Sequence, residues 1–253
     1  MGIFKITRET KIILIFLVCI SGLGFSIAYF YYNGINRSED PRVLETKYMF
    51  IKFDKLMAAK NYEQTFRLLD SIETILLKVP GYSESYERGI VFNNRASVYI
   101  SMALYGPCDS AEKQHLLKLA ENNLLEGINH YQKWIDTMGK LSKDQILMAI
   151  KPDFQESDAA FAGKNYQKIL KKRVKDLVMA QKETPRRLSV AYTNLGIIQR
   201  HQYLQNKAIE SYIKAITLWK DNYTARNNLN VLFGKPPKDR SIINKLFPPD
   251  KNK

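Results

Sequence analysis

The sequence predicts an all-α protein in which an N-terminal transmembrane helix is followed by an α-solenoid of antiparallel helix pairs. Three observations support this fold class. Residues 12–36 contain no charged side chain. After residue 43, apolar residues recur with the period of a helix, whereas no stretch alternates apolar and polar residues as a half-buried strand does. We expect helices at 43–59, 62–78, 83–104, 112–138, 142–150, 157–183 with a break near Gly163, 187–202, 205–219 and 223–233.

Residues 12–32 form the predicted transmembrane anchor. These 21 mostly apolar positions extend over ~31 Å as a helix, which is enough to cross the hydrocarbon core of a bilayer. Lys5, Arg8 and Lys11 precede the segment, whereas cations and acids balance just after it. Because positive charge favours the cytoplasmic side, we expect a cytoplasmic N-terminus at 1–11 and an extracytoplasmic domain behind an uncleaved signal anchor.

Three other interpretations of this segment remain open. The first is a cleaved signal peptide, which would use Ser26-Ile27-Ala28 as its small-x-small cleavage site, although the apolar run exceeds the usual ~7–15 residues. Cys19 offers a lipidation site, but bulky Val18 precedes it where lipoprotein signals carry a small residue. The third interpretation is a buried helix of a soluble protein, which rarely lacks charge over such a length.

The remainder of the chain divides into three parts. We expect residues 33–42 to form a linker and residues 43–234 to form one helical domain. Residues 235–253 are expected to form a basic, flexible tail, which contains two Pro-Pro pairs.

A repeat of 34 residues occurs near the C-terminal end of the helical domain, where residues 191–196 are similar to residues 225–230. The unit 189–222 resembles the tetratricopeptide repeat (TPR), although Gln199 and Lys220 depart from its pattern. Small residues in that pattern let two helices approach closely, and large ones fill the seam between them. The matching residues are Tyr192, Leu195, Gly196, Ala208, Tyr212 and Ala215. A looser similarity to the TPR pattern extends over residues 45–233.

The resemblance implies a protein-binding function, because the first helices of TPR arrays form a groove for a peptide or a partner's helix. That groove is expected to contain Thr193, Asn194, Ile197, Arg200, His201, Arg226 and Asn227. Asn194 also fits the carboxylate clamp of chaperone-binding TPRs, but Asn228 stands where that clamp carries a cation, so a generic protein groove is the better interpretation. The anchor and the closing half repeat are similar to bacterial membrane-anchored TPR accessory proteins of the MxaK-like and Bat types, which accompany von Willebrand A-domain and MoxR-type ATPase partners.

The charge of the chain is strongly basic. Thirty-nine Lys and Arg against 25 Asp and Glu give a net charge of +14, which favours an anionic partner or a membrane surface. Residues 164–187 hold nine cations and two acids, and within them we define a basic patch of Lys168, Lys171, Lys172, Arg173 and Lys175. The patch is either a solvated helix face or a surface for an acidic protein or anionic lipid headgroups. Nucleic acid is not expected, since the patch lacks interleaved aromatic residues.

No catalytic or metal-binding residue is predicted. The sequence contains no nucleophile elbow, no zinc-protease motif, no phosphate-binding loop and no Cys-x-x-Cys. His115, His130 and His201 lie in separate segments, and Cys108 is the only cysteine outside the predicted anchor. We therefore expect no enzyme activity, no cofactor and no small-molecule substrate.

Taken together, these features predict a membrane-anchored TPR scaffold or adaptor that binds protein partners. A composition rich in Lys, Ile and Asn favours a bacterial inner-membrane protein with its helical domain in the periplasm, where it would assist assembly of a periplasmic or membrane complex. The alternative is a basic helical domain that binds anionic lipid headgroups or an acidic polymer at the membrane surface.

Overall fold

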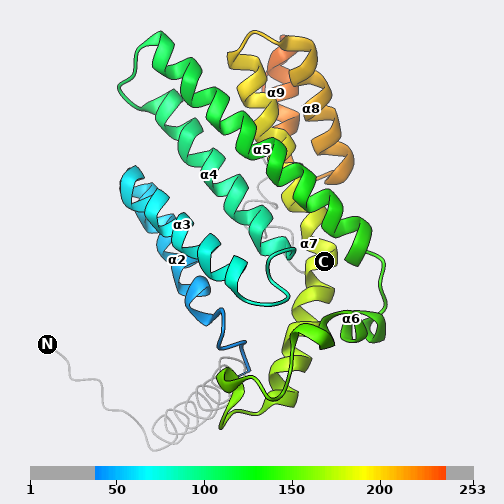
Figure 1. The fold of residues 1–253 in the computed structure, drawn as a ribbon. Coiled ribbons are helices and arrows are strands. Elements are labelled where there is room, and N and C mark those ends of the chain that lie inside the picture. Colours follow the sequence, from blue (N-terminus) through cyan, green and yellow to red (C-terminus); the bar gives the residue numbers. More distant parts are fainter. Residues whose placement is uncertain (1–37, 238–253) are drawn as a thin grey trace, which may run out of the picture.

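The computed structural model describes residues 38–237, and this part of the chain is all-α (Figure 1). The all-α prediction is therefore confirmed for the described residues, which contain no strand. Two short 3₁₀ turns, η1 (Lys151–Asp153) and η2 (Ala159–Phe161), lie between α6 and α7. With the labels of Figure 1, the helices are α2 (Leu44–Ala58), α3 (Tyr62–Lys78), α4 (Tyr86–Tyr105), α5 (Ser110–Met138), α6 (Lys143–Ile150), α7 (Tyr166–His201), α8 (Gln205–Leu218) and α9 (Tyr223–Leu232).

Polar caps determine where several helices begin. At the start of α3, Oδ1 of Asn61 accepts a hydrogen bond from the backbone N–H of Gln64 at 3.2 Å. At the start of α6, Ser142 and Gln145 form a reciprocal capping box. Such side chains satisfy backbone N–H groups that have no partner inside the helix, so helices begin directly after them. The predicted starts of these two helices agree with the structure for this reason.

The predicted break between 157–183 and 187–202 is wrong, because α7 runs through it as one helix of 36 residues with Pro185 inside. Proline lacks a backbone N–H and costs a helix interior ~3 kcal/mol. Tertiary packing offsets this cost, since apolar residues on both sides of Pro185 are buried in two different cores. The expected break near Gly163 does occur: Gly163 has a φ of +69°, and α7 begins only after its cap, Asn165.

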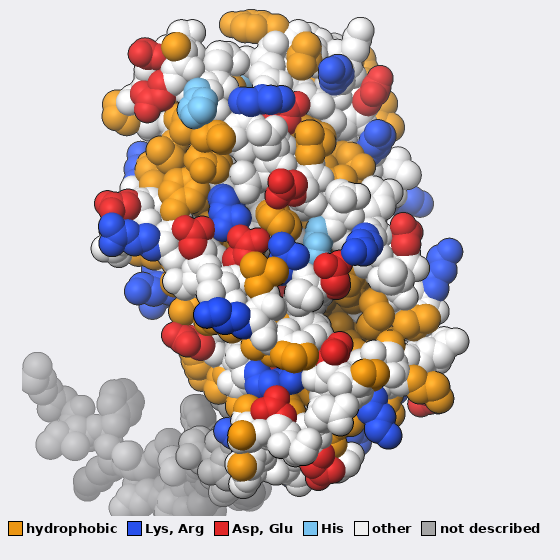
Figure 2. All heavy atoms as spheres, viewed as in Figure 1, with side chains coloured by type: hydrophobic (Ala, Val, Ile, Leu, Met, Phe, Trp, Pro, Cys, Tyr) orange, Lys and Arg blue, Asp and Glu red, His pale blue; other side chains and the backbone are white. Residues whose placement is uncertain are grey.

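The helices form successive antiparallel pairs, namely α2 with α3, α4 with α5, and the second half of α7 with α8 (Figure 1). Helix α5 packs against both α4 and α7, and α9 packs against α8 and α7. Three apolar clusters lie between these pairs, whereas on the outer face in Figure 2 charged side chains of both signs are spread among apolar ones. Helix α7 contributes to each, with Leu177 in the first, Leu188 in the second and Tyr192 beside both the second and the third. Helix α7 therefore connects the N-terminal half of the domain to its C-terminal half.

The residues that carry the repeat pattern lie at the interface of α7 and α8. Ala208, Tyr212 and Ala215 are fully buried there. A Cβ built on Gly196 would lie 2.5 Å from Cε1 of Tyr212, so only glycine allows the two helices to approach this closely. Leu195 is also buried, and Tyr192 is half-buried.

The same contact recurs in the preceding helix pair. A Cβ built on Gly89 of α4 would lie 2.4 Å from Cε1 of Tyr131 of α5. Tyr131 is 1% exposed, as deeply buried as its counterpart in α8. Two successive helix pairs thus pack through a glycine of the first helix against a tyrosine of the second.

From residue 38 to residue 237, no helix is both long enough and apolar enough to cross a membrane. The predicted anchor at 12–32 lies outside the described residues, as do the beginning of the linker and the tail after 237.

Candidate functional site

The predicted groove residues of α7 differ in accessibility. Thr193 is buried: its hydroxyl donates to the carbonyl of Ser189 at 2.8 Å and accepts a hydrogen bond from Nδ2 of Asn222 at 2.9 Å. Asn194 is half-buried and donates to Oδ1 of Asn93 on α4 at 3.3 Å. Thr193 therefore belongs to the interior, whereas Asn194 lies where the first helices of two pairs meet.

The other groove residues lie on α7 and α9 and remain accessible. Ile197, Arg200 and His201 are half-buried along the last two turns of α7, Arg226 is exposed on α9, and Asn227 is half-buried beside it. Burial and the nearby cations Lys113 and Arg200 lower the pKa of His201, so this side chain is neutral at neutral pH.

The basic patch divides into two parts. Lys168, Lys171 and Lys175 are exposed on the first half of α7. Lys172 is instead paired with Asp176, and the side chain of Arg173 is only 6% exposed. Lys172 and Arg173 therefore do not belong to the exposed lysine surface, because both point toward a cavity.

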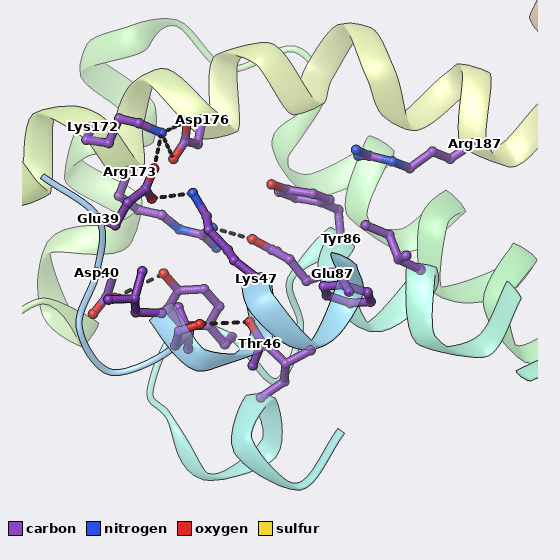
Figure 3. Close-up of a pocket in the computed structure, with 16 residues that line it drawn as sticks. Glu39, Asp40, Thr46, Lys47, Tyr86, Glu87, Lys172, Arg173, Asp176 and Arg187 are labelled. Carbon is purple, nitrogen blue, oxygen red and sulfur yellow. Dashed lines mark hydrogen bonds and ion pairs between the residues drawn. The ribbon is translucent and has the colours of Figure 1, made fainter. Parts of the chain in front are cut away.

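This cavity, of about 210 Å³, lies among the segment before α2, α2 itself, the start of α4 and the middle of α7 (Figure 3). We call it the charged cavity, because charged side chains make up half of its lining. Its carboxylates are Glu39, Asp40, Glu87 and Asp176, and its cations are Lys47, Lys172, Arg173 and Arg187.

A buried ion pair forms one wall of the charged cavity. Nη1 of Arg173 donates to Oε1 of Glu87 at 2.5 Å, and the guanidinium also lies 4.1 Å from the centre of the Tyr82 ring. Burial acts to raise the pKa of Glu87, but the charge and hydrogen bond of Arg173 outweigh it and hold that pKa below its ordinary value. Burial likewise acts to lower the pKa of Arg173, and the nearby Glu87 reverses the shift, so the pair is ionised.

A second set of ion pairs links the segment before α2 to α7. Lys172 pairs with Glu39 at 3.2 Å and with Asp176 at 2.5 Å, and Lys47 of α2 also pairs with Glu39 (Figure 3). These side chains are between 10% and 24% exposed, apart from Lys47 at 49%. This part of the lining of the charged cavity thus consists of paired charges.

The residues just before α2 are anchored by a third buried contact. Asp40 is 5% exposed and accepts hydrogen bonds from the Arg42 guanidinium and from the hydroxyl of Tyr82, the latter at 3.0 Å. Arg42 in turn lies 4.2 Å from the centre of the Phe154 ring. These contacts hold Glu39 and its neighbours at the edge of the charged cavity.

Two polar atoms in the wall of the charged cavity lack partners. Oε2 of Glu87 and Nη1 of Arg187 are buried, and neither has a hydrogen-bond partner in the described part of the chain. Arg187 lies 5.0 Å from the centre of the Tyr86 ring, and both side chains line the cavity (Figure 3). Burial raises the pKa of Tyr86, so its phenol stays protonated and can donate a hydrogen bond.

Sequence reasoning missed this site because its parts are far apart in the chain. Arg173 and Arg187 were recognisable as members of a cation-rich stretch, but their surroundings come from the segment before α2 and from α4. No motif joins Glu39 or Glu87 to that stretch. Only the packing of α7 against α2 and α4 places these side chains in one cavity.

Another cavity, of about 480 Å³, shares Arg173 with the charged cavity as a lining residue. Its lining includes Trp134, Met138 and Phe154, and it is more apolar than the charged cavity. Within residues 38–237, no group of three or more His, Cys, Asp or Glu side chains is arranged to hold a metal ion.

No family model, curated protein or solved structure matches this chain.

Proposed function

We propose that the protein is a membrane-anchored TPR-like scaffold that binds protein partners on the exposed face of α7 and α9. The observation that carries this proposal is the recurrence of the same glycine–tyrosine contact in two successive helix pairs, Gly89 with Tyr131 and Gly196 with Tyr212. Repeated helix pairs stack into extended arrays whose first helices form a continuous binding face. Proteins of this architecture act by holding partners rather than by catalysis.

The proposed binding face has a mixed chemistry that suits a protein surface. Arg200 and Arg226 supply charge, Ile197 supplies apolar area, and Asn194 and Asn227 supply amide groups. Protein interfaces combine apolar contacts with a polar rim of this kind, and arginine is enriched in them.

The anchor adds to binding through proximity. In our proposal, residues 12–32 hold the helical domain at the inner membrane, with the domain on the periplasmic side. Confinement next to the membrane raises the effective concentration of a membrane-bound partner without any additional contact. A variant lacking residues 1–32 should then leave the membrane fraction and lose co-purification of such a partner from cells.

The binding face can be tested with two matched charge reversals. One variant carries Arg200→Glu and Arg226→Glu, and its control carries Lys168→Glu and Lys171→Glu, which changes the net charge by the same amount elsewhere on α7. The tagged full-length chains are crosslinked in cells and purified, and the recovered proteins are identified by mass spectrometry. We expect a stoichiometric, salt-resistant partner that is retained by the lysine variant and lost by the arginine variant. Retention of that partner by the arginine variant would contradict the proposed face.

A second candidate function is the binding of anionic lipid headgroups or an acidic polymer. One observation favours it: Lys168, Lys171 and Lys175 are all exposed and follow the spacing of one helix face. Binding of this kind weakens steeply with ionic strength. Recovery of only salt-sensitive lipid or polymer, lost in the Lys168→Glu, Lys171→Glu variant, would favour this function over the scaffold.

A further inference from the structure

The charged cavity is built like a ligand site rather than like an ordinary core. Of its four cations, Lys47 and Lys172 pair with Glu39, and Arg173 pairs with Glu87. Arg187 is the lining cation that forms no salt bridge within residues 38–237. A buried guanidinium N–H without a partner is costly, since it has lost water and gained nothing in return.

A carboxylate is the ligand group that fits Arg187. It would accept hydrogen bonds from the unpartnered Nη1 of Arg187, and the neutral phenol of Tyr86 is available beside it (Figure 3). A guanidinium binds a carboxylate strongly because both the charge and the planar geometry match.

A second ligand group is indicated by Glu87. Its Oε1 is used by Arg173, but its Oε2 is buried and has no partner in the described part of the chain. The low pKa of Glu87 means that this oxygen is an acceptor at neutral pH. It therefore requires a donor, and an ammonium group is the strongest donor for a carboxylate oxygen.

The size of the cavity limits the ligand. A volume of about 210 Å³ is below the ~300–1,000 Å³ that is typical of sites for drug-sized molecules. Part of its wall is apolar, since Val43, Phe50 and Ile90 also line it. A molecule of a few heavy atoms with two opposite charges and a short apolar part fits these limits.

We propose that the charged cavity binds a free α-amino acid, whose carboxylate is held by Arg187 and whose ammonium group is held by Oε2 of Glu87. This site is separate from the proposed partner-binding face, and it departs from the expectation that the protein takes no small molecule. It lies where the segment after the predicted anchor meets α2, α4 and α7, so an occupied cavity joins that segment to the rest of the domain.

The test uses the full-length chain and a panel of single amino acids at millimolar concentration, with thermal unfolding and titration calorimetry as readouts. For each amino acid, the C-terminal amide and the N-acetyl derivative are the matched controls. We expect one or more amino acids to raise Tm and to bind, and both derivatives to bind at least about tenfold more weakly because each lacks one charged group. Equal binding of the derivatives, or no effect of any amino acid, would overturn the proposal.

Variants locate the site. Arg187→Gln should weaken binding of the amino acid by about tenfold or more, whereas Arg186→Gln, which removes the same charge one position away, should leave it unchanged. Arg187→Lys keeps the charge and should restore part of the affinity. Unchanged binding by Arg187→Gln would place the ligand elsewhere and overturn the assignment. Because the ligand panel is measured on the unmodified chain, its outcome does not depend on the folding of any variant.

Discussion

Arg173 of α7 and Glu87 of α4 form a buried ion pair although 86 positions separate them in the chain. Their side chains are 6% and 14% exposed. Arg173 also stacks on the ring of Tyr82, whose hydroxyl donates to Asp40. One guanidinium therefore links α7 to α4, to the loop before α4 and, through Tyr82, to the segment before α2.

Removing one member of this pair should be much worse than removing both. Arg173→Met alone or Glu87→Leu alone leaves an uncompensated buried charge, and we expect each to lower the free energy of unfolding by about 3–5 kcal/mol. The double variant removes both charges of the pair and should cost clearly less than the sum of the two single variants. Urea unfolding followed by circular dichroism measures all four chains. Additive losses would show that the two side chains do not stabilise each other.

Stability should decrease in mild acid because of His130. Burial lowers the pKa of His130 below 6.5, and the nearby Arg88 and Lys133 lower it further, whereas the hydrogen bond to the carbonyl of Ser85 and the charge of Glu84 act in the opposite direction. A histidine with a lowered pKa in the folded state takes up its proton more readily when unfolded. Its stabilising contribution is therefore complete above pH 6.5 and is lost as the pH falls toward the lowered pKa.

This prediction is tested by the urea midpoint between about pH 7.5 and pH 5.5. Replacing His130 with Gln should reduce the loss of stability in that range, and His201, whose pKa is also lowered, accounts for part of the remainder. The exposed His115 provides the control, because its replacement with Gln removes a histidine that lies on the surface. A profile that is identical in the His130 variant and the unmodified chain would contradict the prediction.

Gly196→Ala should destabilise the interface of α7 and α8. The added Cβ would lie 2.5 Å from Cε1 of Tyr212, and overpacking of this kind costs about 1–3 kcal/mol, which exceeds the ~1 kcal/mol that alanine gains as a helix former. Gly89→Ala, which meets Tyr131 at 2.4 Å, should behave in the same way.

Gly127→Ala is the matched control for these two variants. Its Cβ would lie 3.1 Å from Cβ of Phe92, so the neighbouring helix must shift slightly. The cost of that shift offsets the ~1 kcal/mol that alanine gains as a helix former, and we expect a change in Tm close to zero. The prediction fails if all three alanine variants unfold at the same temperature.

Asn222 should stabilise the domain through its two roles at the start of α9. Its Oδ1 accepts from the backbone N–H of Ala225, and its Nδ2 donates to the hydroxyls of Ser189 and Thr193 at 2.8 and 2.9 Å. Asn222→Ala removes the cap and both buried hydrogen bonds, so we expect a loss of about 2–3 kcal/mol. Asn61→Ala removes only an exposed cap and should cost ~1 kcal/mol.

Asn222→Asp separates the two roles. Aspartate can still cap α9, but it cannot donate to the two hydroxyls, which already donate to the carbonyls of Ala215 and Ser189. We therefore expect this variant to be clearly destabilised in urea unfolding. Stability equal to that of the unmodified chain would show that the cap alone matters.

Local features of the chain were sufficient to predict most of the helices. Asn61 and Ser142 act through hydrogen bonds to residues three positions away, so their effect is visible in a short window of sequence. The repeat unit at 189–222 was also visible, because its glycine and tyrosine are only 16 positions apart.

The corresponding pair in α4 and α5 was not visible, because Gly89 and Tyr131 are 42 positions apart in the chain. Gly89 lies near the start of α4 and Tyr131 near the end of α5, so their contact is far from the loop that joins the two helices. The contact of Gly196 with Tyr212 lies close to the loop between α7 and α8, and for this reason the two residues are also close in the sequence.

The sequence by itself determined the all-α class, most helix boundaries and one helix pair, because these depend on contacts within or between neighbouring turns. Tertiary structure alone decided that α7 continues through Pro185, since burial on both sides of the proline offsets the lost hydrogen bond. Tertiary structure also decided which cations are paired. Lys172 and Arg173 belong to a cation-rich stretch, yet carboxylates from α4, α7 and the segment before α2 pair with them in the folded chain. Electrostatic surroundings depend on distance in space, and residues 39 and 87 come close to residues 172 and 173, respectively, only after the helices have packed.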